Sequence, residues 1–366
     1  MRAGVAPHPI VRGPAIGRAA LVLGGGVALL VAALVVAIGL GSVPIAPDDV
    51  IRILAHRLLG LGSLSGLDAS LSTIVVDIRL PRVLGAMLVG AGLACAGTVF
   101  QAVLRNPLAD PYIIGTAAGA SLGATIGIAL PLLVPAFVLG AGSAWLGLGI
   151  VQVLAFAGGL GTVLLVLSVA RSGGQLPSVT LLLTGYAVSS LLAAGVALIM
   201  ISSGRALAAI FSWLMGSLAA VGWLDLAVAV PIIIGGFMVT FARWRTLNLL
   251  VLGDAAAAHL GLDVGREKLL LTLLATFVTS AAVAISGTIG FVGLVVPHLV
   301  RLVVGPDHRL LLPASAVGGA ILLVMADLGA RLTGGVPVGV VTAFVGAPFF
   351  LWLLRRPRGA HAVGHA

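Results

Sequence analysis

Long runs of apolar residues, separated by short polar stretches, decide what this chain can fold into. A helix that crosses a bilayer needs about 20 mainly apolar residues, and in lipid its backbone groups must all be bonded within the protein. Ten runs meet or approach that length, at residues 19–41, 82–104, 112–131, 145–170, 178–202, 224–242, 268–287, 289–304, 310–332 and 337–354. We therefore predict an all-α polytopic membrane protein with about ten transmembrane helices.

The composition indicates that lipid is the solvent for most of the chain. Hydrophobic residues make up 60% of it and charged residues only 8%, whereas a soluble protein carries about a quarter charged residues. The first run is longer than the apolar core of a signal peptide and other spans follow it, so we interpret it as a retained span. A shorter apolar run at 205–219 predicts a partial helix that dips into the membrane.

The positions of lysine and arginine predict the orientation, because short cytoplasmic loops carry an excess of both. If the N-terminus is cytoplasmic, most of the 20 lysines and arginines fall on the inner side. The C-terminus is then also cytoplasmic, as an even number of spans requires. We predict a single transmembrane domain over residues 1–366 in the plasma (inner) membrane. Its cytoplasmic parts are an N-terminal segment, a link and a tail, at 1–18, 243–268 and 355–366.

Motifs for nucleotide, metal or covalent chemistry are missing from the sequence. A P-loop requires a lysine that reaches the phosphates, and the only lysine, Lys268, follows an acid, Glu267. HExxH, CxxC and GxSxG are also missing, and the one cysteine, Cys95, lies inside an apolar run. We therefore expect no enzymatic activity, catalytic residue, cofactor or metal site. The basic residues do not alternate with aromatic ones, so we expect no nucleic-acid partner.

Asp327 is the acid that lies furthest inside an apolar run. It precedes Arg331 by four residues, a spacing that puts both side chains on one face of a helix. The pair is interpreted as a structural ion pair near the outer end of its span. A proton-binding site, as secondary transporters use, is the alternative that the sequence leaves open.

The stretch "RNPLADPYIIGTAAG" at 105–119 interrupts two apolar runs on the cytoplasmic side. Pro107 and Pro111 disfavour helix in the residues before them, Asn106 and Asp110. These two side chains can hydrogen-bond the backbone locally. The pattern predicts a compact, rigid turn, and a plain loop would not need two prolines.

Glycine then recurs every fourth residue along the third span, which places a smooth groove on one face of the helix. Such a groove lets a neighbouring helix approach backbone to backbone. A matching row of small residues runs along the second span, at Ala86, Gly90, Ala94 and Thr98. We predict that helix packing explains the glycines, which are Gly115, Gly119, Gly123 and Gly127.

The link at 243–268 is the longest cytoplasmic connection. Asp254 is a suitable N-cap for the helix "AAAAHL", and Gly261 a suitable stop. Asp263 could cap a second short turn. We predict two short helices along the membrane face that form a docking site for a partner, with a plain surface linker as the alternative.

Together these features resemble the FecCD-type permeases, the membrane subunits of ATP-binding-cassette importers for iron–siderophores, haem and cobalamin. The matching segments include "LRNPLADPYIIGTAAGASLGA", "LGDAAAAHLGLDVGREK" and "GTIGFVGLVVPHLVRLVVGPDHR". They lie within the ranges 78–124, 211–223, 252–268, 287–313 and 336–354. The resemblance covers most of the chain from residue 78 and implies the type II ABC importer permease fold.

The resemblance also implies partners. Two permease chains would pair around a central path, as a homodimer or as a heterodimer with a homologue. Cytosolic ABC ATPase subunits would bind below and an extracytoplasmic substrate-binding protein outside. The ATPase coupling residues would be Gly253, Asp254, Ala257, His259 and Gly261 of the link.

The same resemblance assigns a gate and a docking surface. Asn106 and Leu108 resemble one half of a cytoplasmic gate, and the segment at Pro177 and Ser178, before the fifth span, resembles the other. The second match has a proline where the family has a more polar run. Binding-protein docking would fall to Arg79, Arg82 and Arg331.

The cargo is the open part of this interpretation. We favour a bulky metal chelate, specifically a ferric siderophore, because siderophore permeases are frequent in the family; a haem or cobalamin importer is the alternative. A proton-coupled secondary carrier would need a mechanistic acid, for which only Asp327 is available. A structural membrane protein would have no water-accessible path.

Overall fold

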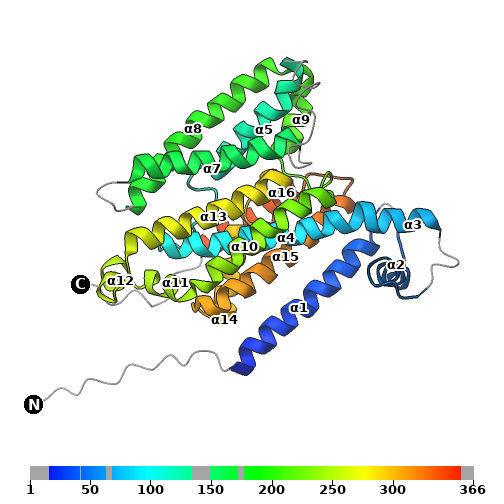
Figure 1. The fold of residues 1–366 in the computed structure, drawn as a ribbon, viewed down its shortest axis with the longest axis horizontal. Coiled ribbons are helices and arrows are strands. Elements are labelled where there is room, and N and C mark those ends of the chain that lie inside the picture. The colour runs from blue at the N-terminus through cyan, green and yellow to red at the C-terminus, as the bar shows by residue number, and fades with distance from the viewer. Residues whose placement is uncertain (1–15, 42, 63–67, 134–148, 172–176, 356–366) are drawn as a thin grey trace, which may run out of the picture.

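A computed structural model describes residues 16–41, 43–62, 68–133, 149–171 and 177–355. The predicted cytoplasmic N-terminal segment and tail lie almost entirely outside the described residues. Within the described ranges the regular elements are all helices (Figure 1). The first of them are α1 (Ile16–Gly39), α2 (Pro47–Leu59), α3 (Ala69–Thr73), a π-helical segment (Ile74–Arg79), α4 (Leu80–Val103), α5 (Thr116–Leu133), α7 (Ile150–Ala170) and α8 (Ser178–Ser202).

The second half of the chain continues the same pattern. Its elements are a 3₁₀ turn (Gly204–Ala206), α9 (Leu207–Leu214), α10 (Trp223–Ala242), α11 (Trp244–Val251), α12 (Asp254–His259), α13 (Val264–Ser286), α14 (Val292–Val304), α15 (His308–Leu332) and α16 (Val338–Arg355). The three short helices α9, α11 and α12 connect longer ones.

Seven of the described helices are long and apolar enough to cross a membrane, and α5, α14 and α16 are shorter apolar helices. Together they occupy the positions of the ten predicted spans. The predicted partial helix at 205–219 corresponds to the 3₁₀ turn and α9. The sequence did not predict α2, which carries acids in its first turn, a proline at its start and Gly60 in the left-handed region at its end.

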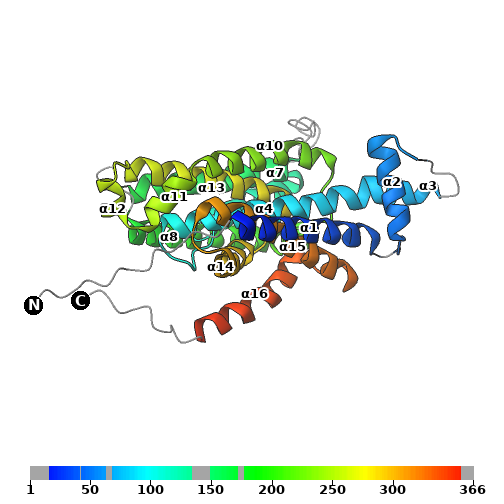
Figure 2. The ribbon, with the colours of Figure 1, turned by 90° about the horizontal axis from the view of Figure 1, so that it is seen from below.

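Helix α4 forms the centre of the bundle and contacts α13, α14 and α15. Its most apolar stretch is 83% buried, whereas that of α8, at the edge of the molecule, is 11% buried. In Figure 1, α5, α7, α8 and α9 form one layer, the central helices a second, and α1 flanks the opposite side. Figure 2 shows α16 leaning away from the other helices.

Small residues set the close approaches between helices. Gly119, Gly123 and Gly127 of α5 face α7, and a Cβ on Gly119 or Gly123 would collide with backbone atoms of α7. Gly115, with φ +94, precedes the helix and is not part of this row. The small-residue row of α4 faces α15, because a Cβ on Gly90 would collide with the backbone of Gly319. The two rows therefore serve two different helix pairs.

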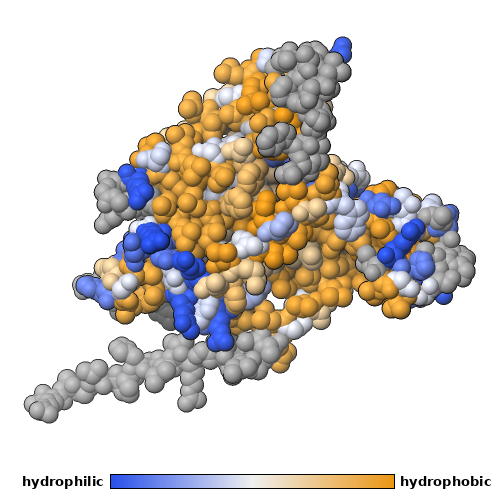
Figure 3. Space-filling view, in the orientation of Figure 1, coloured by the Kyte–Doolittle hydropathy of each residue, from blue (hydrophilic) through white to orange (hydrophobic). Residues whose placement is uncertain are grey.

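The surface is divided along the long axis of the molecule. Figure 3 shows a broad apolar belt with hydrophilic patches at its two ends. One end holds α11 and α12, and the other holds α2 (Figure 1). Exposed apolar side chains of α8 include Leu183, Leu191 and Ile201. This is the surface of a membrane-embedded bundle, in which lipid covers the belt.

Candidate functional site

The predicted ion pair of Asp327 is confirmed, and the structure adds a second partner. Arg82 donates from Nη2 to Asp327 Oδ1 at 2.8 Å and from Nε to Asp327 Oδ2 at 3.1 Å. Arg331 Nε lies 3.1 Å from Asp327 Oδ2. A planar guanidinium fits a carboxylate in this two-pronged way. The sequence spacing revealed Arg331 but not Arg82, because Arg82 comes from α4, 245 residues away.

Arg79 and Arg331 both hold the C-terminal end of α1. Arg79, only 6% exposed, donates to the carbonyl oxygens of Ile38 and Gly39 at 2.8 and 3.0 Å. Arg331 donates to Ala37 O at 2.8 Å. The last carbonyls of a helix lack partners within it and carry partial negative charge, so cations stabilise them. The three predicted docking arginines thus lie together at the α2 end, each with partners inside the chain.

The turn after α4 has the local bonds that its sequence predicted. Asn106 Oδ1 accepts from Leu108 N at 3.0 Å, and Asp110 Oδ1 accepts from Tyr112 N at 2.9 Å. Burial raises the pKa of Asp110 to about 6, against the lowering effect of the Tyr112 N–H. Tyr112 also donates its hydroxyl to Ile289 O at 3.0 Å. The turn is therefore a folded unit that contacts the connection between α13 and α14.

Pro177 and Ser178 lie at the start of α8, with Pro177 in extended conformation before the first helical residue. Further along α8, Gly185 packs against the backbone of Ile113 and Ile114, so this helix runs beside the end of the turn. Among the described residues no hydrogen bond or ion pair joins Pro177 or Ser178 to Asn106. A gate formed by these two segments stays a prediction.

The link contains two short helices, α11 and α12, as predicted, but their placement differs. Asp263 accepts from Arg266 N at 3.1 Å and thereby caps α13 itself, so no separate helix follows α12. Asp254 is not the cap of α12 but its first residue. Its carboxylate is instead bonded to Lys268 Nζ at 2.6 Å, because this buried ammonium needs an acid.

One face of α12 is buried and the other is exposed. Gly261, with φ +87, ends the helix as predicted. Ala257 is fully buried, whereas His259 is exposed and Leu260 is 62% exposed. Of the predicted coupling residues, His259 therefore lies where a partner could touch it, and Ala257 supports the helix from beneath.

The sequences of known proteins identify the class of this bundle. The model of the FecCD transport family matches residues 29–356. The chain belongs to the FecCD transport family. One relative of this FecCD chain is the cobalamin import system permease protein BtuC of Halobacterium salinarum, 47% identical over 79% of this chain and 75% of the relative. The hemin transport system permease protein HmuU of Yersinia pestis is 43% identical over 77% and 83%.

A solved structure agrees with this assignment of the FecCD chain. It is described as an inward-facing conformation of a metal-chelate type ABC transporter, and it superposes with a TM-score of 0.76 at 32% identity. The superposition covers 92% of this chain and 99% of that chain. The expected family and fold are confirmed, and this FecCD chain is a multi-pass plasma-membrane protein of the ABC permease class.

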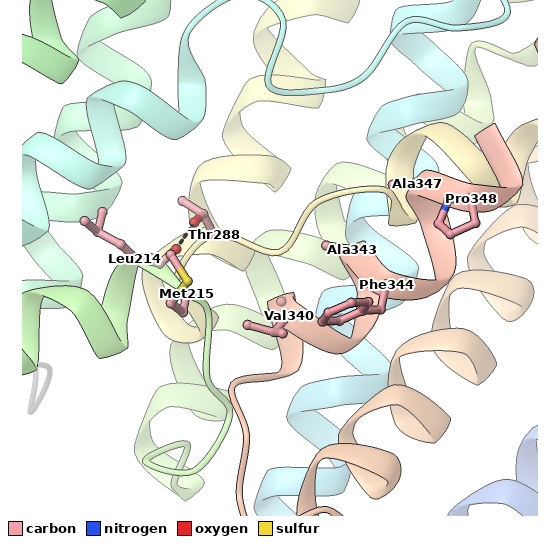
Figure 4. Close-up of a pocket in the computed structure, with 9 residues that line it drawn as sticks. Leu214, Met215, Thr288, Val340, Ala343, Phe344, Ala347 and Pro348 are labelled. Carbon is pink, nitrogen blue, oxygen red and sulfur yellow. Dashed lines mark hydrogen bonds between the residues drawn. The ribbon is translucent and has the colours of Figure 1, made fainter. Parts of the chain in front are cut away.

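One cavity among the described residues of the FecCD chain is apolar. It measures about 510 Å³ and lies between the end of α9, the connection at Thr288 and α16 (Figure 4). Its lining includes Leu214, Met215, Val340 and Phe344. The described residues also contain no group of three histidine, cysteine or acidic side chains that could hold a metal. The cavity thus offers shape and apolar surface, without a charge that would fix a particular ligand.

Proposed function

We propose that this FecCD chain is the permease subunit of an importer that moves a bulky metal chelate, with a ferric siderophore as cargo. The observation that carries the importer part of the proposal is the match to relatives named as permeases of cobalamin and hemin import systems. The choice of a siderophore as cargo follows the frequency of siderophore permeases in the family.

Corrinoid import is the second candidate. It is favoured by the 47% identity to the cobalamin permease of Halobacterium salinarum. Both cargoes are bulky metal chelates, so the permease lining is a poor discriminator between them and the binding protein a good one.

ATP hydrolysis by partner subunits would drive transport. Cytosolic ABC ATPases would dock on the exposed face of α12, and an extracytoplasmic binding protein on the end that holds Arg82 and Arg331. A second permease chain, identical or homologous, would complete the path. The predicted cytoplasmic position of α11 and α12, from the arginine distribution, is consistent with this arrangement.

A proton-coupled carrier is less well supported. Asp327, the candidate acid that the sequence offered, has both carboxylate oxygens engaged by the guanidinium groups of Arg82 and Arg331. It also lies near the end of α15 rather than at its middle.

Reconstitution tests the proposal. The permease, its ATPase and its binding protein would be placed in vesicles, and uptake of iron-labelled ferrichrome and labelled cyanocobalamin measured with ATP and with a non-hydrolysable analogue. We expect uptake of ferrichrome that depends on ATP and on the binding protein, whereas uptake of cyanocobalamin instead would support corrinoid import. Uptake driven by a proton gradient without ATPase would refute the proposal.

A further inference from the structure

Helix α4 ends in an unusual way. Asn106 N donates to Gln101 O and Arg105 N donates to Ala102 O, at 3.1 and 3.2 Å, the bond pattern that closes a helix through a left-handed residue. Glycine normally takes that position, because other residues are strained there. Here it is Arg105, with φ +50.

The Arg105 side chain reaches the first turn of α12. Its Nε lies 3.9 Å from Asp254 Oδ1. Its Nη1 lies 3.3 Å from where a Cβ on Gly253 would be, and Gly253 itself has φ +108. The guanidinium therefore lies beside Gly253 and Asp254, at the start of α12.

Asp254 has one bonded carboxylate oxygen and one that could accept a bond from Arg105. Its Oδ2 accepts from Lys268 Nζ of α13 at 2.6 Å. Its Oδ1 is buried and receives no hydrogen bond among the described residues, and Arg105 lies just beyond bonding distance. A buried carboxylate oxygen without a donor is unfavourable, so a small movement of α12 toward Arg105 would be stabilised by a new charge-assisted bond.

We propose that Arg105 and Asp254 transmit movement between the link helix α12 and the turn that carries Asn106 and Leu108. This inference rests on the proposed function, in which ATPases move α12. Arg105 is a positioning residue: its guanidinium lies close enough to Asp254 to bond it after a small movement of α12, and so to couple the end of α4 to α12. Displacement of α12 then pulls on the residue directly before Asn106.

The first test distinguishes a role of Arg105 in coupling from a role in the stability of the fold. In the reconstituted complex, Arg105→Gly relieves the backbone strain and removes the guanidinium. We expect the thermal unfolding temperature to stay the same or rise, while labelled cargo imported per ATP hydrolysed falls by about five-fold or more, the range of ordinary coupling energies. Arg171→Gln, which removes an exposed arginine after α7, serves as the control and should leave this ratio unchanged.

A double-mutant cycle assigns the effect to the pair. Arg105→Gln, Asp254→Asn and the double variant should reduce the import ratio non-additively, the double variant behaving like the worse single one. Asp254→Asn also weakens the bond to Lys268, but this effect is present in both the single and the double variant and therefore cancels in the cycle.

The outcomes are distinct. If wild-type complex imports no cargo with ATP, the proposed function fails, whatever Arg105 does. If the wild type imports cargo and Arg105→Gly keeps the full import ratio, or the cycle is additive, the inference is overturned while the proposed function stands.

Discussion

At the residue scale, Arg79 is the clearest case of a side chain whose role changes once its surroundings are known. From the sequence it belongs to a docking surface. In the structure it is buried and its guanidinium caps the end of α1. Docking by Arg79 stays a prediction, but any substitution there acts first on the fold.

We therefore expect Arg79→Gln to destabilise the permease. It leaves helix-end carbonyls without a donor, at about 1–3 kcal/mol for each buried group left unsatisfied. The thermal unfolding temperature in detergent would measure it, with Arg52→Gln on the exposed side of α2 as control. Equal unfolding temperatures for the two variants would contradict the capping role.

Asp110 predicts a pH dependence. Burial raises its pKa from 3.8 to about 6 in the folded chain. Between these values the folded state binds more protons than the unfolded state, so the free energy of unfolding falls as pH rises through this window. Asp110→Asn keeps an acceptor for Tyr112 N and cannot ionise. Its stability relative to wild type should increase from about pH 4 to about pH 6 and then level off. If denaturation experiments gave a stability difference between Asp110→Asn and wild type that is constant with pH, the raised pKa of Asp110 would be contradicted.

At the element scale, the α5–α7 pair depends on glycine. A methyl group on Gly119 would meet Thr162 and the backbone of Gly158, whereas one on Gly161 of α7 would meet open space. We expect Gly119→Ala to cost about 1–3 kcal/mol by overpacking, and Gly161→Ala to be tolerated. Unfolding temperature and yield of folded protein would compare the two. Equal tolerance would show that α5 and α7 do not pack as closely as described.

At the scale of the whole molecule, the two polar ends face different partners in the proposed importer. Arg82 keeps 19% of its side chain exposed while it binds Asp327, so it can offer a guanidinium edge to an acidic surface. Exposed ion pairs are individually weak, about 0.2–1 kcal/mol, but they steer encounter.

Arg82→Gln should therefore slow association of the binding protein and reduce the dependence of the on-rate on salt. Surface plasmon resonance on the reconstituted permease at several salt concentrations would measure this, with basal ATP hydrolysis retained as the control for folding. If the on-rate and its salt dependence are unchanged, Arg82 acts only as the partner of Asp327.

The sequence by itself determined the features that depend on local composition. Apolar run length fixed the helical spans, because lipid leaves no other way to satisfy the backbone. Turn chemistry at Asn106 and Asp110 and the end of α12 at Gly261 are local too, and all three were predicted correctly. The family also followed from the sequence, because its motifs are contiguous.

Only the tertiary structure decided which distant groups meet. Both rows of small residues can be recognised in the sequence. Only the packed structure shows that α5 pairs with α7 and α4 with α15. The local sequence makes Asp254 a suitable N-cap, but its carboxylate is bonded to the buried ammonium of Lys268 instead. Arg82 reaches Asp327 across 245 residues. The sequence pattern fixes what each segment can offer, whereas close packing and the need to pair buried charges select the partner from elsewhere in the chain.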